Sequence, residues 1–129
     1  MGTILDKVAY LIFGSRENDI SNLLDKNLDY VHRDAAAEAL LKREFGPDTV
    51  AAYLRVACDP DESRELVEEC GEDLGIVWAG LDECPSVEDF ARLRPEARAY
   101  AYHIIQSRKP EWLPMLLWPW KKDGQILAE

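Results

Sequence analysis

The sequence lacks long hydrophobic runs and a recognisable leader. No apolar stretch in its 129 residues approaches the ~20 residues that span a bilayer. The amino end shows no basic segment followed by an apolar run and a small-residue cleavage site. We therefore expect a cytoplasmic protein that does not enter a membrane.

Cysteine and histidine are scarce and scattered. The three cysteines, Cys58, Cys70 and Cys84, are odd in number and widely spaced, which does not suggest a disulfide framework and favours a reducing compartment. His32 and His103 lie far from them in sequence, and zinc sites usually contain a close Cys or His pair. We expect packing roles for the cysteines, with no metal and no cofactor.

Motifs for catalysis are also absent. Gly14-Ser15 lacks the second glycine of a nucleophile elbow, and the chain has neither a phosphate-cradling glycine loop nor a metalloprotease histidine pair. The stretch from Asp59 to Ser63 starts like a calcium loop, but Arg64 replaces the required glycine and Cys70 the required glutamate. The sequence thus predicts a protein that is not an enzyme.

Positive charge is nearly missing from one segment. Residues 59–89 hold twelve acidic residues and one basic residue, Arg64, within a chain of net charge −10. Nucleic-acid affinity comes mainly from Lys and Arg neutralising phosphates, so this surface does not bind DNA or RNA directly.

The residues that are present predict an all-α protein. Apolar residues are 47 % and charged residues 31 % of the chain, close to globular averages. Apolar residues recur at helical spacing, and no window alternates like a half-buried strand. We predict a compact single-domain bundle of about seven short-to-medium helices over residues 1–122, with a short flexible tail at 123–129.

Several local signals set the expected helix boundaries. The four amino-terminal helices are expected at Thr3–Phe13, Asn18–Tyr30, Asp34–Phe45 and a stretch ending near Ala57. Gly46-Pro47 predicts a left-handed cap and a stop. Asp59 is the expected N-cap of the next helix, with Pro60 as its first helical residue. Ser86 is the expected N-cap of the helix after that. A helix beginning at Pro95 would place Tyr100 on its apolar side.

The segment from Asp61 to Leu81 predicts one strongly one-sided helix. At about 100° per residue, its large apolar residues except Ile76 share one arc and its acids share the opposite arc, although Gly71 and Gly75 leave a break open. The acidic arc contains Asp61, Glu62, Glu65, Glu68, Glu69, Glu72 and Asp73.

This acidic face is the main functional candidate. Like charges three or four residues apart destabilise a helix by a few tenths of a kcal/mol per pair, so their retention suggests a role. We predict a binding module of the inhibitor, immunity or nucleic-acid-mimic type, with a basic protein as partner, nucleic-acid-binding proteins included. The partner-binding residues would be Glu62, Glu65, Glu69, Glu72 and Asp73. The alternative is a solvated face that keeps the protein soluble.

Three of the four tryptophans, Trp112, Trp118 and Trp120, lie in one carboxyl-terminal segment interrupted by Pro114 and Pro119. A short helix or irregular strap is expected there. It either closes the core or docks a partner, because Trp is enriched where partners bind. The second functional hypothesis is therefore a structural or adaptor subunit that assembles through these tryptophans. The sequence does not indicate an oligomeric state.

Overall fold

The computed structural model describes residues 14–117, 121–122 and 125–126. These residues form seven α-helices and one 3-10 turn, which confirms the all-α prediction. The elements are α2 (Arg16–Leu24), α3 (Tyr30–Leu40), α4 (Pro47–Ala57), α5 (Arg64–Leu81), α6 (Val87–Arg92), α7 (Pro95–Arg108), η1 (Pro110–Trp112) and α8 (Leu113–Leu117). The helix expected over Thr3–Phe13 lies outside the described residues.

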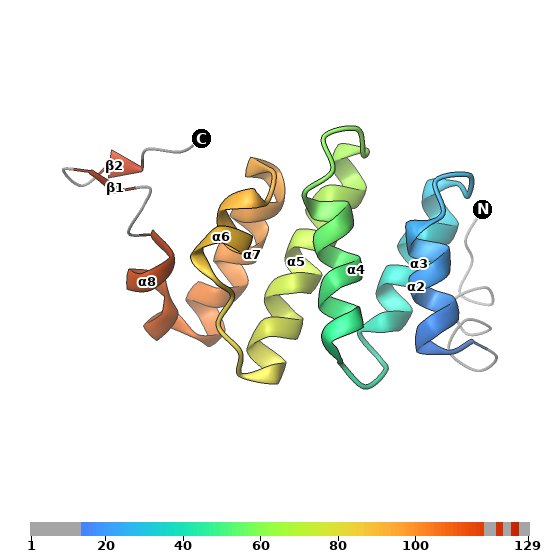
Figure 1. Ribbon diagram of the computed structural model, residues 1–129, viewed down its shortest axis with the longest axis horizontal. Coiled ribbons are helices and arrows are strands. Elements are labelled where there is room, and N and C mark those ends of the chain that lie inside the picture. Colours follow the sequence, from blue (N-terminus) through green and yellow to red (C-terminus); the bar gives the residue numbers. More distant parts are fainter. Residues whose placement is uncertain (1–13, 118–120, 123–124, 127–129) are drawn as a thin grey trace.

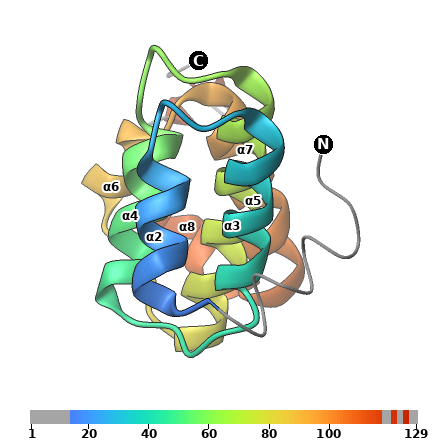
Figure 2. The ribbon, with the colours of Figure 1, turned by 90° about the vertical axis from the view of Figure 1, so that its right-hand side faces the viewer.

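Successive helices run up and down and stack side by side along the long axis of the molecule (Figure 1). Seen along that axis, α2, α4 and α6 form one layer, and α3, α5 and α7 form the other (Figure 2). The contact between α5 and α7 is the most extensive between any two described helices. The middle helix α5 therefore has α3 on one flank and α7 on the other.

A single buried core runs through the stack. Each of the seven helices contributes a large side chain that is at most 1 % exposed, and these are Leu23, Leu40, Tyr53, Leu74, Phe90, Ile105 and Leu116. The hydroxyl of Tyr53 donates a 2.6 Å hydrogen bond to the carbonyl of Ala37, which satisfies the phenol inside the core and joins α4 to α3. No helix among the described residues combines the length and apolarity that crossing a bilayer requires.

Helix α5 is continuous through Gly71 and Gly75, so the break left open by the sequence does not occur. It spans 18 residues, or about 27 Å. A Cβ atom at Gly71 would lie 2.4 Å from the carbonyl oxygen of Ala97, and one at Gly75 would lie 2.7 Å from Cβ of Ile104. The two glycines are needed because α7 passes too close for any larger residue.

Three expected helices have different boundaries in the structure. Ser63, not Asp59, caps α5, because the carboxylate of Asp59 instead accepts the backbone N–H of Asp61 within a turn. Gly46 does not end the third helix in a left-handed conformation. Helix α3 ends at Leu40, and Gly46 has an extended φ of −145° as the N-cap of α4. Helix α2 is likewise shorter than the expected Asn18–Tyr30.

Other boundaries agree with the sequence signals. Ser86 caps α6, and Pro95 is the first residue of α7. The carboxyl-terminal segment forms η1 and the short α8, followed by the two-residue strands β1 (Lys121–Lys122) and β2 (Gln125–Ile126), which pair antiparallel. The strands were not expected. The remaining residues of the predicted tail, 123–124 and 127–129, lie outside the described part of the chain.

Candidate functional site

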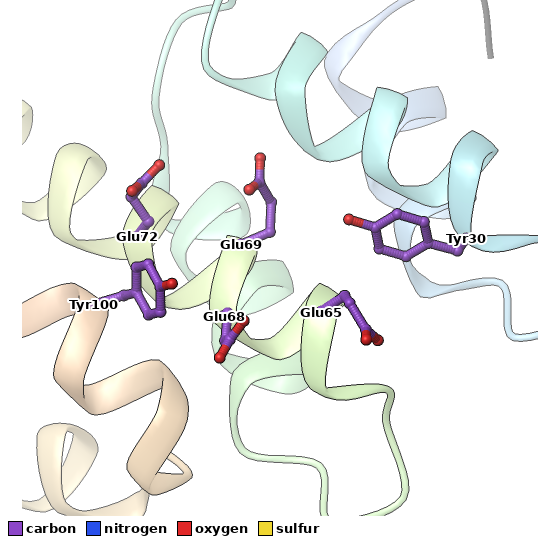
Figure 3. A pocket seen from close by; sticks show the side chains of 6 residues that line it. All are labelled: Tyr30, Glu65, Glu68, Glu69, Glu72 and Tyr100. Atoms are coloured by element: carbon purple, nitrogen blue, oxygen red, sulfur yellow. The ribbon is translucent and has the colours of Figure 1, made fainter.

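A hollow of about 230 Å³ lies over the exposed side of α5, between α3 and α7 (Figure 3). Its floor comes from glutamates of α5, and a tyrosine flanks it on either side. We call it the acidic groove, defined by Tyr30, Glu65, Glu68, Glu69, Glu72 and Tyr100. Glutamates three and four residues apart share one side of a helix, which explains why α5 presents all four together.

Two glutamates of the groove carry negative charge that no described residue neutralises. Glu68 pairs with Arg64 across 3.0 Å, one turn earlier on the same helix. By contrast, Glu65 and Glu72 form no hydrogen bond or ion pair within the described part of the chain. Glu65 is exposed and Glu72 is partly exposed. Both carboxylates are therefore open to a cation from outside.

The two tyrosines are among the few large hydrophobic side chains that stay exposed. Tyr30 is 44 % exposed and comes from α3, whereas Tyr100 is 41 % exposed and comes from α7. The sequence placed Tyr100 on the apolar side of its helix, and its exposure shows that this prediction is wrong. Burial and the charges of nearby acids, Asp34 first, raise the pKa of Tyr30, so its phenol stays neutral.

Sequence reasoning did not assign either tyrosine to the site. Tyr30 is the first residue of α3 and Tyr100 lies in the middle of α7, far apart in the chain. They meet at the groove only because α3 and α7 flank α5 (Figure 3). No motif or local spacing in the sequence contains that information.

Asp73 does not belong to the exposed acidic face, in contrast to the prediction. Its side chain is 1 % exposed, and its Oδ2 atom has no hydrogen-bond partner among the described residues. Burial, together with the neighbouring charges of Glu69 and Glu72, raises its pKa to about 9. At neutral pH this carboxyl is therefore protonated and adds no charge to the groove.

Glu62 is also not available to a partner. It lies in the loop before α5, where Arg33 donates two hydrogen bonds of 2.8 and 2.7 Å to its two carboxylate oxygens. Both side chains are only 7 % exposed. Hydrogen bonding from Arg33 lowers the pKa of Glu62 despite its burial. This buried ion pair fastens the loop to α3 and is a structural contact.

The three tryptophans predicted to bind a partner have different outcomes in the structure. Trp112 lies in the core at 7 % exposure, with the Lys109 ammonium 5.7 Å from its ring centre. Trp118 and Trp120 lie outside the described residues, so their expected docking role stays a prediction.

The remaining reactive groups do not converge. Cys58, Cys70 and Cys84 are unpaired thiols, and burial raises the pKa of each. Within the described ranges, no three His, Cys, Asp or Glu side chains are grouped so that they could hold a metal ion.

A second hollow of about 330 Å³ lies between the start of α4 and the end of α5. Phe45, Val50, Trp78 and Leu81 form its apolar lining, and Cys84 and Glu83 also line it. Its lining is mainly apolar, with Glu83 and Asp89 among its charged residues, whereas the acidic groove is lined by four glutamates and two tyrosines.

Comparisons with models of protein families, with curated proteins and with solved structures find no match for this chain. Any functional conclusion therefore rests on the site itself.

Proposed function

We propose that this chain is a non-enzymatic binding protein that holds a basic segment of a partner protein in the acidic groove. The observation that carries the proposal is a pair of carboxylates, Glu65 and Glu72, which no residue in the described ranges neutralises and which lie between two half-exposed tyrosines. Nucleic-acid-binding proteins are natural candidates because their phosphate-binding surfaces are rich in Lys and Arg.

The chemistry of the groove suits the side chains of arginine and lysine. Carboxylates accept charge-assisted hydrogen bonds from a guanidinium, and the face of a tyrosine ring attracts a cation within about 6 Å. The hollow, at about 230 Å³, is smaller than the ~300–1,000 Å³ of typical small-molecule pockets. That size favours a side chain of a larger partner over a free metabolite.

The net charge of the protein also favours a basic partner. Five of the twelve acids in segment 59–89 lie in ion pairs and Asp73 is protonated. The chain as a whole still has a net charge of −10, so its field attracts basic partners and repels acidic ones. Such complementarity mainly raises the association rate, which implies a steep dependence of binding on salt.

Fluorescence anisotropy with a labelled octa-arginine peptide tests the proposal. Glu65→Gln with Glu72→Gln should weaken binding about tenfold at low salt, because each lost contact contributes roughly 0.5–1 kcal/mol. The matched control is Glu44→Gln with Glu111→Gln, which removes the same charge from two exposed sites outside the groove. An equal loss of affinity in both double variants would show that peptide binding depends only on net charge, and the proposal would be wrong.

The tyrosines provide a second, charge-neutral test. Tyr30→Leu with Tyr100→Leu keeps the net charge and much of the apolar volume but removes both aromatic faces. Octa-arginine binding should weaken about three- to tenfold, as expected for two exposed cation–π contacts. Unchanged binding would remove the tyrosines from the proposed site.

A structural or adaptor role through the tryptophan-rich segment remains the second hypothesis. The burial of Trp112 assigns that residue to the core. The hypothesis therefore depends on Trp118 and Trp120, and size-exclusion chromatography of variants at those two positions would test it.

A further inference from the structure

The second hollow lies where α4 begins, where α5 ends and where the chain turns toward α6 (Figure 1). It is separate from the acidic groove, because the two have no lining residue in common. Its volume of about 330 Å³ lies within the ~300–1,000 Å³ of typical small-molecule pockets. The second hollow is therefore large enough for one small ligand.

The lining of this hollow is mostly apolar and includes two aromatic rings. Trp78 of α5 is only 4 % exposed, and Phe45, Val50 and Leu81 are partly buried against the same core. The ring of Phe45 lies against α5, since a Cβ atom at Gly80 would be 3.0 Å from its Cε2 atom. Rings held by packing in this way offer apolar contact to a flat ligand at little cost in entropy.

The rim of the hollow is polar because of how the chain leaves α5. Asp82 ends the helix in the left-handed conformation, with a φ of 54°. The backbone N–H of Glu83 then donates a 3.1 Å hydrogen bond to the carbonyl of Trp78, which is the usual closure of such a helix end. An ion pair of 2.6 Å between Asp82 and Lys109 also holds the turn. The reversal brings Glu83 to the edge of the hollow.

The charge at this rim is negative. Glu83 is exposed, and its carboxylate forms no hydrogen bond or ion pair with any described residue. Asp89 also lines the hollow, but it is paired with Arg92 at 2.6 Å. Among the described residues, no lysine or arginine lines the hollow, and the net charge of −10 disfavours anions. Aromatic rings beside an available carboxylate therefore match a ligand that combines a ring with a positive charge.

We propose that the second hollow binds a small aromatic molecule that carries a protonated amine. The ring of the ligand lies against Trp78 and Phe45, and its ammonium group donates a charge-assisted hydrogen bond to the carboxylate of Glu83. This site is additional to the proposed function, because none of the residues that line the acidic groove takes part in it.

Three indole ligands of similar shape and different charge test the site. They are tryptamine, which is a cation, tryptophol, which is neutral, and indolepropionate, which is an anion. In NMR titrations of the full chain, tryptamine should bind in the millimolar range, as expected for a ligand of its size. It should bind roughly two- to fivefold more tightly than tryptophol, because an exposed ion pair contributes little, and indolepropionate should bind most weakly. The shifted amides should lie in residues 45–50 and 78–89.

A matched pair of variants tests the role of Glu83. Glu83→Gln should lower the affinity for tryptamine to that for tryptophol. The control Glu88→Gln removes the same charge from an exposed residue outside the hollow and should keep the preference for tryptamine. Phe45→Leu keeps an apolar side chain but removes one ring, and it should weaken binding of both ligands about two- to tenfold.

The outcomes distinguish the ligand class from the site itself. Equal affinity for the three ligands, or a preference that Glu83→Gln leaves unchanged, overturns the amine as the ligand class. Tryptamine shifts confined to the residues of the acidic groove, or no shifts at millimolar concentration, overturn the site.

Alkylation of Cys84 gives a second measurement on the native chain. This thiol is exposed and lines the hollow, whereas the partly exposed Cys58 does not line it. Saturating tryptamine should slow the reaction of Cys84 with iodoacetamide several-fold and leave that of Cys58 unchanged, as followed by peptide mass spectrometry. An unchanged rate at Cys84, or equal slowing at both thiols, would overturn the site.

Discussion

Replacing Asp73 with asparagine should change how the stability of the protein depends on pH. The pKa of Asp73 is about 9 in the folded chain, against an ordinary value of 3.8. A carboxyl with a raised folded pKa holds its proton more tightly when folded. Its contribution to stability is thus fully present below the unfolded pKa and is lost as pH rises toward the folded pKa.

The magnitude follows from one pKa unit being about 1.4 kcal/mol. Between about pH 5 and pH 8 the unfolded carboxyl is ionised while the folded one stays protonated. The free energy of unfolding of the native chain should therefore fall by about 4 kcal/mol relative to Asp73→Asn over that interval. The amide of asparagine adds its own constant cost or gain, so the informative quantity is the slope of the difference.

Urea denaturation followed by circular dichroism at several pH values measures that slope. Asp61→Asn serves as the reference, because its side chain is exposed and its curve should run parallel to the native one. Parallel curves for Asp73→Asn and the native chain would show that Asp73 is ionised in the fold, and the reasoning about its burial would be refuted.

Three further substitutions test the packing around the groove. Gly71→Ala should destabilise the fold by about 1–3 kcal/mol in thermal melts, because the new Cβ atom would overlap the α7 backbone. The control is Gly80→Ala at an exposed position, where the new Cβ atom meets only a side chain. This control should leave stability unchanged or raise it by up to about 1 kcal/mol. Equal melting temperatures would contradict the close approach. Glu62→Gln should cost about 3–5 kcal/mol in urea denaturation at neutral pH, since it leaves the buried Arg33 charge uncompensated, and a loss below about 1 kcal/mol would show the pair to be solvated. Trp112→Ala should cost about 3–5 kcal/mol with no change in octa-arginine binding, and the reverse pattern would assign Trp112 to the binding surface.

Helix content and some helix starts could be predicted because their causes are local. Ser86 and Pro95 begin helices through interactions within one turn, which the sequence displays directly. Asp59 presents the same local pattern, but its carboxylate is used in a turn and in an ion pair with Lys26. The turn competes with capping locally, and the sequence pattern shows neither this turn nor the ion pair with Lys26.

The candidate site was predictable only in part, for a geometric reason. The angular positions of residues around α5 place Glu65 and Glu72 on one face, as the structure shows. They do not indicate which part of that face a neighbouring helix covers. Asp73 lies in such a covered part and is buried. Tyr30 and Tyr100 belong to neighbouring helices, so no property of the α5 sequence could indicate them.

The glycine contact between α5 and α7 also bears on what recognition costs. At Gly71 the α5 backbone lies against the backbone of Ala97 on α7, and at Gly75 it lies against the side chain of Ile104, so steric contact limits the approach of the two helices at both positions. The backbones that carry Tyr100 and the glutamates are therefore held by packing, which would lower the entropy cost of the binding proposed above. The contact of α3 with α5 is less extensive than that of α7 with α5. The two sides of the acidic groove therefore differ in how closely they pack against α5, with Tyr100 on the more closely packed side and Tyr30 on the other.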